Sequence, residues 1–67
     1  MATDLDIYRA AAVMARQFGS DAAREAAVRA RSMGEKNDRE GQRIWERIAR
    51  AVQELRNVER PADQTLQ

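Results

Sequence analysis

The stretch from residue 41 to residue 60 constrains the fold of this 67-residue chain most strongly. Its large apolar side chains recur at steps of three and four residues, which places them on one face of an α-helix at about 100° per residue. They are Ile44, Trp45, Ile48, Val52, Leu55 and Val58. The opposite face carries a row of arginines, Arg39, Arg43, Arg47 and Arg50. The pattern predicts one long helix with an apolar face turned inward and a basic face turned to solvent.

A shorter helix is predicted over residues 4–17, near the amino end of the chain. Thr3 is the expected N-cap, and the carboxylates of Asp4 and Asp6 suit the positive end of the helix dipole in the first turn. The expected buried face consists of Ile7, Ala11, Met14 and Phe18, with Tyr8 on its flank. Gly19 follows as the residue able to end the helix with a positive φ.

A second helix is predicted over residues 21–33, with Ser20 as its N-cap and Gly34 as its end. Its expected inner face is built almost entirely of alanine and consists of Ala22, Ala23, Ala26, Ala27, Ala30 and Met33. Alanine has the highest helix propensity and adds little volume, so this face favours close approach of a neighbouring helix.

The long third helix is predicted to begin at Asn37, which forms a capping box with Glu40, and to stop at Pro61. Gly41 in its first turn indicates either close contact with another backbone or tolerance near a helix end.

Three helices joined by short turns predict an all-α fold, a three-helix bundle with a longer third helix. Residues 1–60 are expected to form a single domain, and residues 61–67 a mobile polar tail. Because the third helix exceeds its companions in length, part of it is expected to overhang them, with Leu55 and Val58 as exposed apolar residues that could join two copies.

The composition argues against an enzyme or a cofactor site. The chain contains no Cys and no His, so it lacks disulfides, thiolate ligands and the commonest general base. Glu35, Asp38 and Glu40 lie close in sequence but lack the spacing of a calcium loop, so we expect no metal, no cofactor and no small-molecule substrate. No export signal or membrane-spanning segment is recognised, which predicts a cytoplasmic protein.

The arginine row has three interpretations. It is an ordinary solvated face, a docking site for an acidic protein, or a strip that lies along a phosphate backbone. The net charge of only +1 argues against a general nucleic-acid binder. The spacings Glu46 to Arg50 and Glu35 to Arg39 predict local ion pairs, which are typical of a solvated face. Trp45 is interpreted as a core or rim residue, with an anchor for a partner as the alternative.

Three segments carry a resemblance to a known family. They are residues 6–11, residues 18–23, and the stretch from Asn37 through Gly41 and Trp45 to Leu55. On these the chain resembles a family of short, uncharacterised alphaproteobacterial proteins, and the likeness covers roughly residues 5–55. That family has no assigned activity, so the resemblance implies a free-standing small protein and no particular functional residues.

Together these observations predict a small non-enzymatic binding or regulatory module that acts on a protein partner through its third helix. A homodimer that buries the overhang is one form of this hypothesis. The alternatives are a nucleic-acid-associated factor that uses the arginine row and a small inhibitor of a larger enzyme, of the kind that phages encode. The residues predicted to contact a partner are Arg39, Arg43, Arg47, Arg50, Trp45, Leu55 and Val58.

Overall fold

The computed structural model of the chain describes residues 3–59, and the side chains of residues 3–57. Its elements are α1 (Asp4–Phe18), a 3-10 turn η1 (Gly19–Asp21), α2 (Ala22–Glu35) and α3 (Arg39–Glu59). The all-α class predicted from the sequence is confirmed for this part of the chain, which contains no strand. The predicted tail over residues 61–67 lies outside the described residues.

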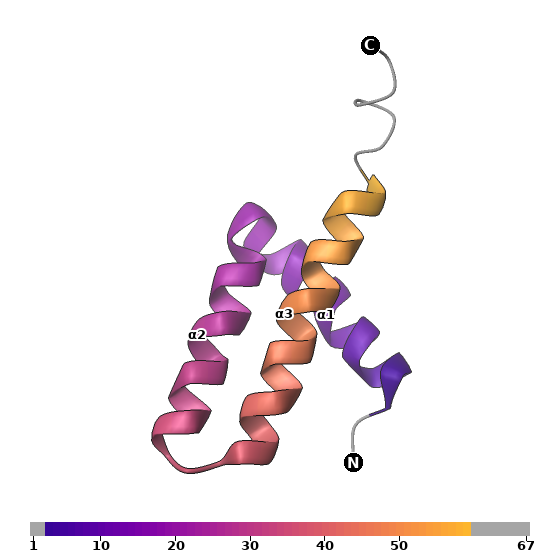
Figure 1. Cartoon of the computed structure of the whole chain (residues 1–67). Helices are drawn as coiled ribbons and strands as arrows, with labels where there is room; N and C mark the ends of the chain where they lie inside the picture. The colour runs from indigo at the N-terminus through magenta and orange to yellow at the C-terminus, as the bar shows by residue number, and fades with distance from the viewer. Residues whose placement is uncertain (1–2, 60–67) are drawn as a thin grey trace.

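The helices are arranged as an antiparallel pair crossed by a third element. Figure 1 shows α2 and α3 side by side, connected by the turn at the bottom of the view, and α1 crossing behind the carboxyl-terminal half of α3 at a steep angle. The arrangement leaves α3 in contact with both other helices along its apolar side, as its sequence pattern predicts.

The first helix begins as its sequence predicts. The backbone N–H of Asp6 donates to the Thr3 hydroxyl oxygen at 3.2 Å, and the backbone N–H of Thr3 donates to the Asp6 carboxylate at 3.3 Å. This reciprocal pair satisfies two backbone donors that a helix start otherwise leaves without partners. Thr3 is confirmed as the N-cap.

The junction between α1 and α2 differs from the expected helix restart at Ser20. Ser20 lies within η1, and no side chain caps the start of α2. The chain instead stays helical from Asp4 to Glu35 and bends at Gly19, which has φ 56° and ψ −128°. The positive φ expected for Gly19 is confirmed, because a bend this sharp needs a conformation that L side chains rarely adopt.

Gly19→Ala is expected to lower the free energy of unfolding by about 1–3 kcal/mol, the usual cost of a non-glycine residue in such a backbone conformation. No atom lies within 4 Å of the position that the new Cβ would take, so the effect isolates backbone strain from crowding. Urea denaturation followed by circular dichroism measures it.

Gly34→Ala provides the matched control. Gly34 lies inside α2, where alanine is the better helix former by about 1 kcal/mol, and its Cβ would meet only the flexible end of Gln42 at 3.0 Å. This variant is expected to be neutral or up to about 1 kcal/mol more stable. Equal losses at both glycines would contradict a strained bend at Gly19.

In the turn between α2 and α3, the residues that end α2 and cap α3 differ from those that the sequence predicts. The α2 helix continues through Gly34, and Asn37 supplies the positive φ, 63°, that closes it. The N–H of Asp38 donates to the Met33 carbonyl at 2.8 Å and the N–H of Asn37 to the Gly34 carbonyl at 3.0 Å. These are the two bonds of a Schellman motif, which ends a helix with a left-handed residue.

The cap of α3 is therefore Asp38, and the predicted capping box of Asn37 and Glu40 is wrong. One Asp38 carboxylate oxygen accepts from the backbone N–H of Gly41 at 2.9 Å. A Cβ on Gly41 would lie 2.8 Å from the other carboxylate oxygen and 3.1 Å from the Met33 sulfur. Gly41 thus makes room for the capping side chain and for Met33, and not for a second backbone.

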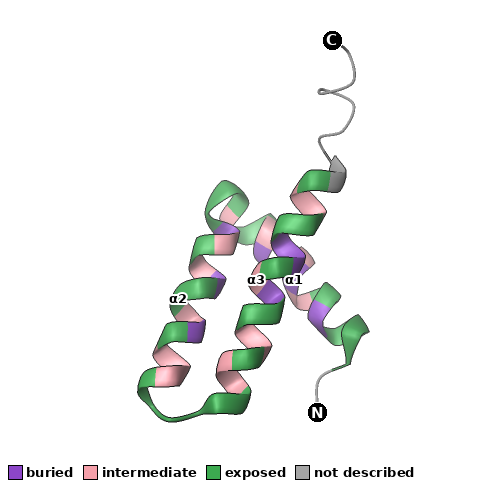
Figure 2. Ribbon diagram, in the orientation of Figure 1, coloured by how far each residue is buried: buried purple, intermediate pink, exposed green. Residues whose placement is uncertain are grey.

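The core lies where the three helices meet, as Figure 2 shows by the buried residues on their facing sides. Val52 is its largest fully buried side chain, and Ile48 is buried beside it. The other buried residues of the cluster are Ile7, Ala11, Met14, Ala22, Ala26 and Ala51. The long helix is continuous and its predicted apolar face points inward, so the central prediction for residues 41–60 is confirmed within α3.

Candidate protein-binding surface

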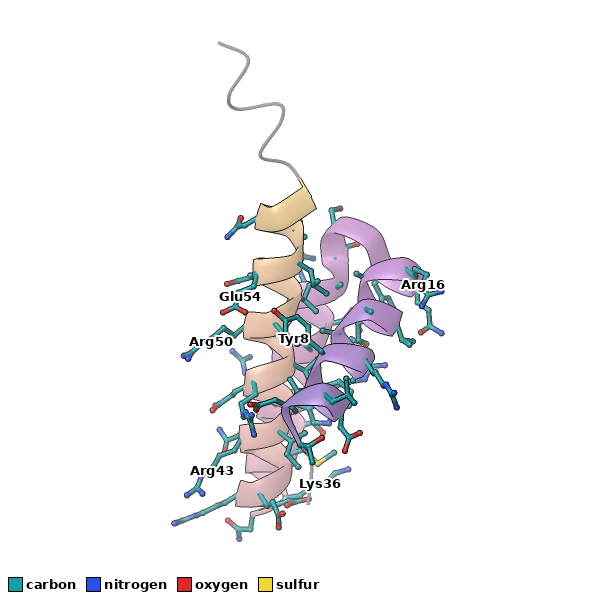
Figure 3. All side chains as sticks on the ribbon, turned by 90° about the vertical axis from the view of Figure 1, so that its right-hand side faces the viewer. Tyr8, Arg16, Lys36, Arg43, Arg50 and Glu54 are labelled. Carbon is teal, nitrogen blue, oxygen red and sulfur yellow. The ribbon has the colours of Figure 1, made fainter. Side chains whose placement is uncertain are left out.

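The four arginines of the predicted row are all exposed on α3, on the side away from Ile48 and Val52. Figure 3 shows Arg43 and Arg50 projecting from α3 on the side away from α1. We refer to Arg39, Arg43, Arg47 and Arg50 as the arginine row. Its guanidinium groups meet solvent along the amino-terminal half of α3.

Only one member of the arginine row forms an ion pair among the described residues. Arg47 donates to the carboxylate of Asp4 at the start of α1, far away in sequence. The local pairs predicted for Glu46 with Arg50 and for Glu35 with Arg39 do not form, and Glu46 instead accepts from the Gln42 amide at 3.4 Å. Within the described part of the chain, Arg43 and Arg50 therefore carry charge that no carboxylate neutralises.

A groove of about 270 Å³ separates α1 from α3 next to the arginine row. It is lined by Asp4, Ile7, Tyr8, Arg47, Arg50, Ala51 and Glu54. Tyr8 is 48% exposed, and Figure 3 places it at the junction of the two helices, close to Arg50 and Glu54. A smaller hollow of about 190 Å³ lies between Arg43, Glu46, Arg47 and Arg50. An aromatic side chain and arginines thus share one continuous surface.

The part of α1 in this surface was missed by the sequence pattern, which assigns Tyr8 to the flank of the core. Asp4 and Tyr8 lie one turn apart on the same side of α1. Leu5, which is 58% exposed, precedes Tyr8 by three residues and lies outside the lining of the groove. Tyr8 is displaced by about 100° from the buried Ile7, which was the available signal that it points toward solvent. The crossing of α1 over α3 could not be read from this spacing.

The other predicted contact residues lie on different sides of the molecule. Trp45 is partly buried and packs against the core, and Leu55 does the same, so Leu55 is not the exposed overhang that the sequence predicts. The length of α3 therefore did not predict how far the other helices cover it. The side chain of Val58 lies outside those described.

Trp45 participates in a stack that the sequence did not reveal. The Arg29 guanidinium carbon lies 5.4 Å from the centre of the Trp45 ring and 5.4 Å from that of Phe18. Glu25 pairs with the same guanidinium at 3.3 Å. Arg29 therefore joins α2 to aromatic residues at the end of α1 and on α3.

Arg29→Ala is expected to lower the free energy of unfolding by about 1–2 kcal/mol, because it removes two cation–π contacts of about 0.5–1 kcal/mol each at a partly exposed site. Thermal unfolding followed by circular dichroism tests this. Arg24→Ala, an exposed arginine on the same helix, is the control and is expected to change stability by less than about 0.5 kcal/mol. Equal effects of the two substitutions would show that the aromatic stack contributes nothing.

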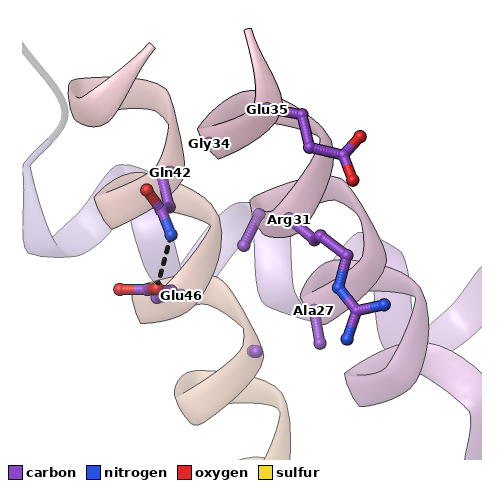
Figure 4. Close-up of a pocket in the computed structure, with 8 residues that line it drawn as sticks. Ala27, Arg31, Gly34, Glu35, Gln42 and Glu46 are labelled. Atoms are coloured by element: carbon purple, nitrogen blue, oxygen red, sulfur yellow. Dashed lines mark hydrogen bonds between the residues drawn. The ribbon is translucent and has the colours of Figure 1, made fainter. Parts of the chain in front are cut away.

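A larger groove of about 550 Å³ lies between α2 and α3 (Figure 4). Small residues make up half of its lining, Ala27, Ala30, Gly34 and Ala49. Figure 4 shows Arg31 and Glu35 along the α2 side and the hydrogen-bonded pair of Gln42 and Glu46 on the α3 side. The charged residues of its lining, Arg31, Glu35 and Glu46, are mixed in sign.

The acidic residues near the second turn do not converge. Asp38 is engaged as the cap of α3, and residues 3–57 contain no group of three side chains placed to hold a metal ion. Among the described helices, none is both long and apolar enough to cross a membrane.

Searches of protein-family models, curated proteins and solved structures give no match to this chain. The resemblance to short alphaproteobacterial proteins therefore stays a prediction.

Proposed function

We propose that the chain is a non-enzymatic protein-binding module in which α1, α2 and α3 act as a three-helix bundle and α3 docks on an acidic partner. The observation that carries the proposal is the arginine row, where Arg43 and Arg50 are exposed and have no carboxylate partner within the described residues. Arginine is enriched at protein interfaces because its planar fork binds carboxylates through two hydrogen bonds.

A protein fits this surface better than a nucleic acid does. Glu46 borders the row and Glu54 continues it one turn beyond Arg50, so negative charge interrupts the basic surface. A phosphate backbone offers only negative charge and would be repelled at these points, whereas a protein can place a basic or neutral residue opposite each of them.

The proposal is tested by capture of partners from the native cell with three versions of the chain. The double variant Arg43→Glu/Arg50→Glu is compared with the wild type and with Arg16→Glu/Arg24→Glu. The control reverses the same number of charges at exposed sites on α1 and α2. All lysates are treated with nuclease, and bound proteins are identified by mass spectrometry.

A protein retained by the wild type and the control but lost from the Arg43→Glu/Arg50→Glu variant is the expected result. Proteins retained equally by all three versions would contradict a docking role for the row. Duplex DNA that binds the purified chain, weakens steeply with salt and is lost in the same variant would establish the nucleic-acid function instead.

A further inference from the structure

We propose that the groove between α1 and α3, together with the adjoining hollow at Arg43, Arg47 and Arg50, binds an amphipathic helix of the partner. Its acidic flank lies on these three arginines and its apolar flank on Tyr8 and the neighbouring Leu5. This inference rests on the proposed protein-binding function and specifies the chemistry of the partner. It draws on the charge of α3, the carboxylate already seated at Arg47, and the exposed apolar side chains of α1.

The spacing of the arginines matches that of another helix. Arg43, Arg47 and Arg50 follow steps of four and three, and they span about 10 Å along α3 at 1.5 Å per residue. A helix lying alongside offers carboxylates at the same intervals if its acidic residues follow steps of four and three. Each carboxylate then meets one guanidinium, in the helix-in-groove mode that many binding modules use.

Asp4 shows where such a carboxylate would sit. It reaches Arg47 from α1 across the mouth of the groove, and its side chain is 91% exposed. An exposed pair of this kind contributes little to stability, so a partner carboxylate can displace it without great loss. Asp4 therefore occupies, within the molecule, the contact that we assign to the acidic flank of the partner.

The apolar side of the groove is provided by α1. Tyr8 and Ile7 of α1 line the groove, opposite Ala51 of α3, and Leu5 is exposed one turn from Tyr8, beside the groove. A tyrosine beside a groove presents a large ring at low entropic cost and frequently anchors an interface. An extended acidic chain without apolar residues would leave this surface uncovered, which is why we assign an amphipathic helix.

Glu54 gives the surface a direction. It continues the arginine row at the carboxyl-terminal end and lines the same groove. A partner helix bound in the favoured direction places a basic or uncharged residue opposite Glu54, while the reversed helix brings a carboxylate there. The charge order along the partner is thus part of the predicted recognition.

The experiment uses synthetic peptides and the full chain. The first peptide is a helix of about 20 residues with three Glu on one flank at steps of four and three, Leu residues on the adjoining flank, and one Lys a turn beyond the last Glu. In the second peptide the three Glu are Gln, and in the third the Leu residues are Ser. Fluorescence anisotropy measures their affinities for the wild type and variants at two salt concentrations.

The first peptide is expected to bind the wild type at least about tenfold more tightly than either of the others. Arg43→Glu/Arg50→Glu should weaken it at least about tenfold and Tyr8→Ala about fivefold. Val13→Ala, a similarly exposed apolar residue on another side of α1, should leave the affinity unchanged. Circular dichroism of each variant confirms that it folds.

Asp4→Asn tests the proposal through an expected increase in affinity for the first peptide. Removal of the internal carboxylate frees Arg47 and is expected to tighten binding of the first peptide about two- to fivefold. The capping pair of Thr3 and Asp6 is untouched by this change, so α1 keeps its start.

Equal affinities for the Glu and Gln peptides, no binding of the Glu peptide, or full affinity in Tyr8→Ala would each overturn the acidic amphipathic helix. The proposed protein-binding function has its own test, which is whether captured proteins are lost from the Arg43→Glu/Arg50→Glu variant. A captured partner that is sensitive to this variant but is not displaced by the first peptide leaves the binding module standing and refutes the helix.

Discussion

Val52→Ala is expected to lower the free energy of unfolding by about 2–3 kcal/mol. Val52 is fully buried where α3 meets the other helices, so its loss removes about two methylene equivalents from the core and leaves a cavity. A chain of this size has a total stability of only about 3–5 kcal/mol, and the substitution therefore removes most of it. The midpoint of thermal unfolding should fall by about 10–20 °C.

The matched control is Val28→Ala on α2. Val28 is 56% exposed, so the same atoms are removed without opening a cavity. Because alanine is the better helix former, this variant is expected to be neutral or a few tenths of a kcal/mol more stable. Similar losses in both variants would mean that the helices do not pack as described around Val52.

Ala26→Leu is expected to destabilise the fold by about 1–3 kcal/mol or more, although it adds apolar surface. Ala26 is fully buried, on the side of α2 that belongs to the core. A larger side chain there forces α2 away from its neighbours and disturbs the remaining contacts. Urea denaturation followed by circular dichroism gives the change in the unfolding midpoint and in the slope of the free energy of unfolding against urea concentration.

Ala27→Leu, at the next residue, is the control, because it introduces the same side chain at a site where it is not crowded. Ala27 is exposed and lines the open groove between α2 and α3, where a longer side chain has room. Its effect is expected to stay within about 0.5 kcal/mol. If Ala26→Leu were as well tolerated as Ala27→Leu, the close packing inferred from the alanine-rich face would be contradicted.

Helical periodicity was sufficient to predict the core of the long helix. Ile48 and Val52 recur at four-residue spacing and are buried, and the arginine row on the other side is exposed. Such a pattern is reliable because a long amphipathic helix has only one way to bury its apolar face. On α2, Ala22, Ala26 and Ala30 are buried at the same spacing, but the prediction was wrong for Ala27, which is exposed.

The helix ends were harder to predict because several residues competed for each role. Gly34 and Asn37 can both close α2, and Asn37 and Asp38 can both cap α3. The outcome depends on which carbonyls the Schellman motif closes and on the room that Gly41 leaves for the Asp38 side chain. Neither is encoded in the identity of a single residue.

The candidate surface was predicted only in part. The arginine row lies on one helix and follows from spacing, but Tyr8 and Asp4 join it because of the angle at which α1 crosses α3. Exposure of Leu55 was predicted from the helix lengths, and these do not reveal the angle at which helices cross. The prediction was wrong because Leu55 packs against the core. Contacts between segments distant in sequence were the information that periodicity lacked.

The bend at Gly19 also determines how copies of this chain could exchange parts. If residue 19 adopted ordinary helical angles, Asp4 to Glu35 would form a straight rod of about 48 Å, and α1 would leave its own α3. The uncovered Ile48 and Val52 would then be covered by the amino-terminal arm of a second copy, in a domain-swapped dimer. The bend at Gly19 is thus what allows α1 to cover the α3 of its own chain.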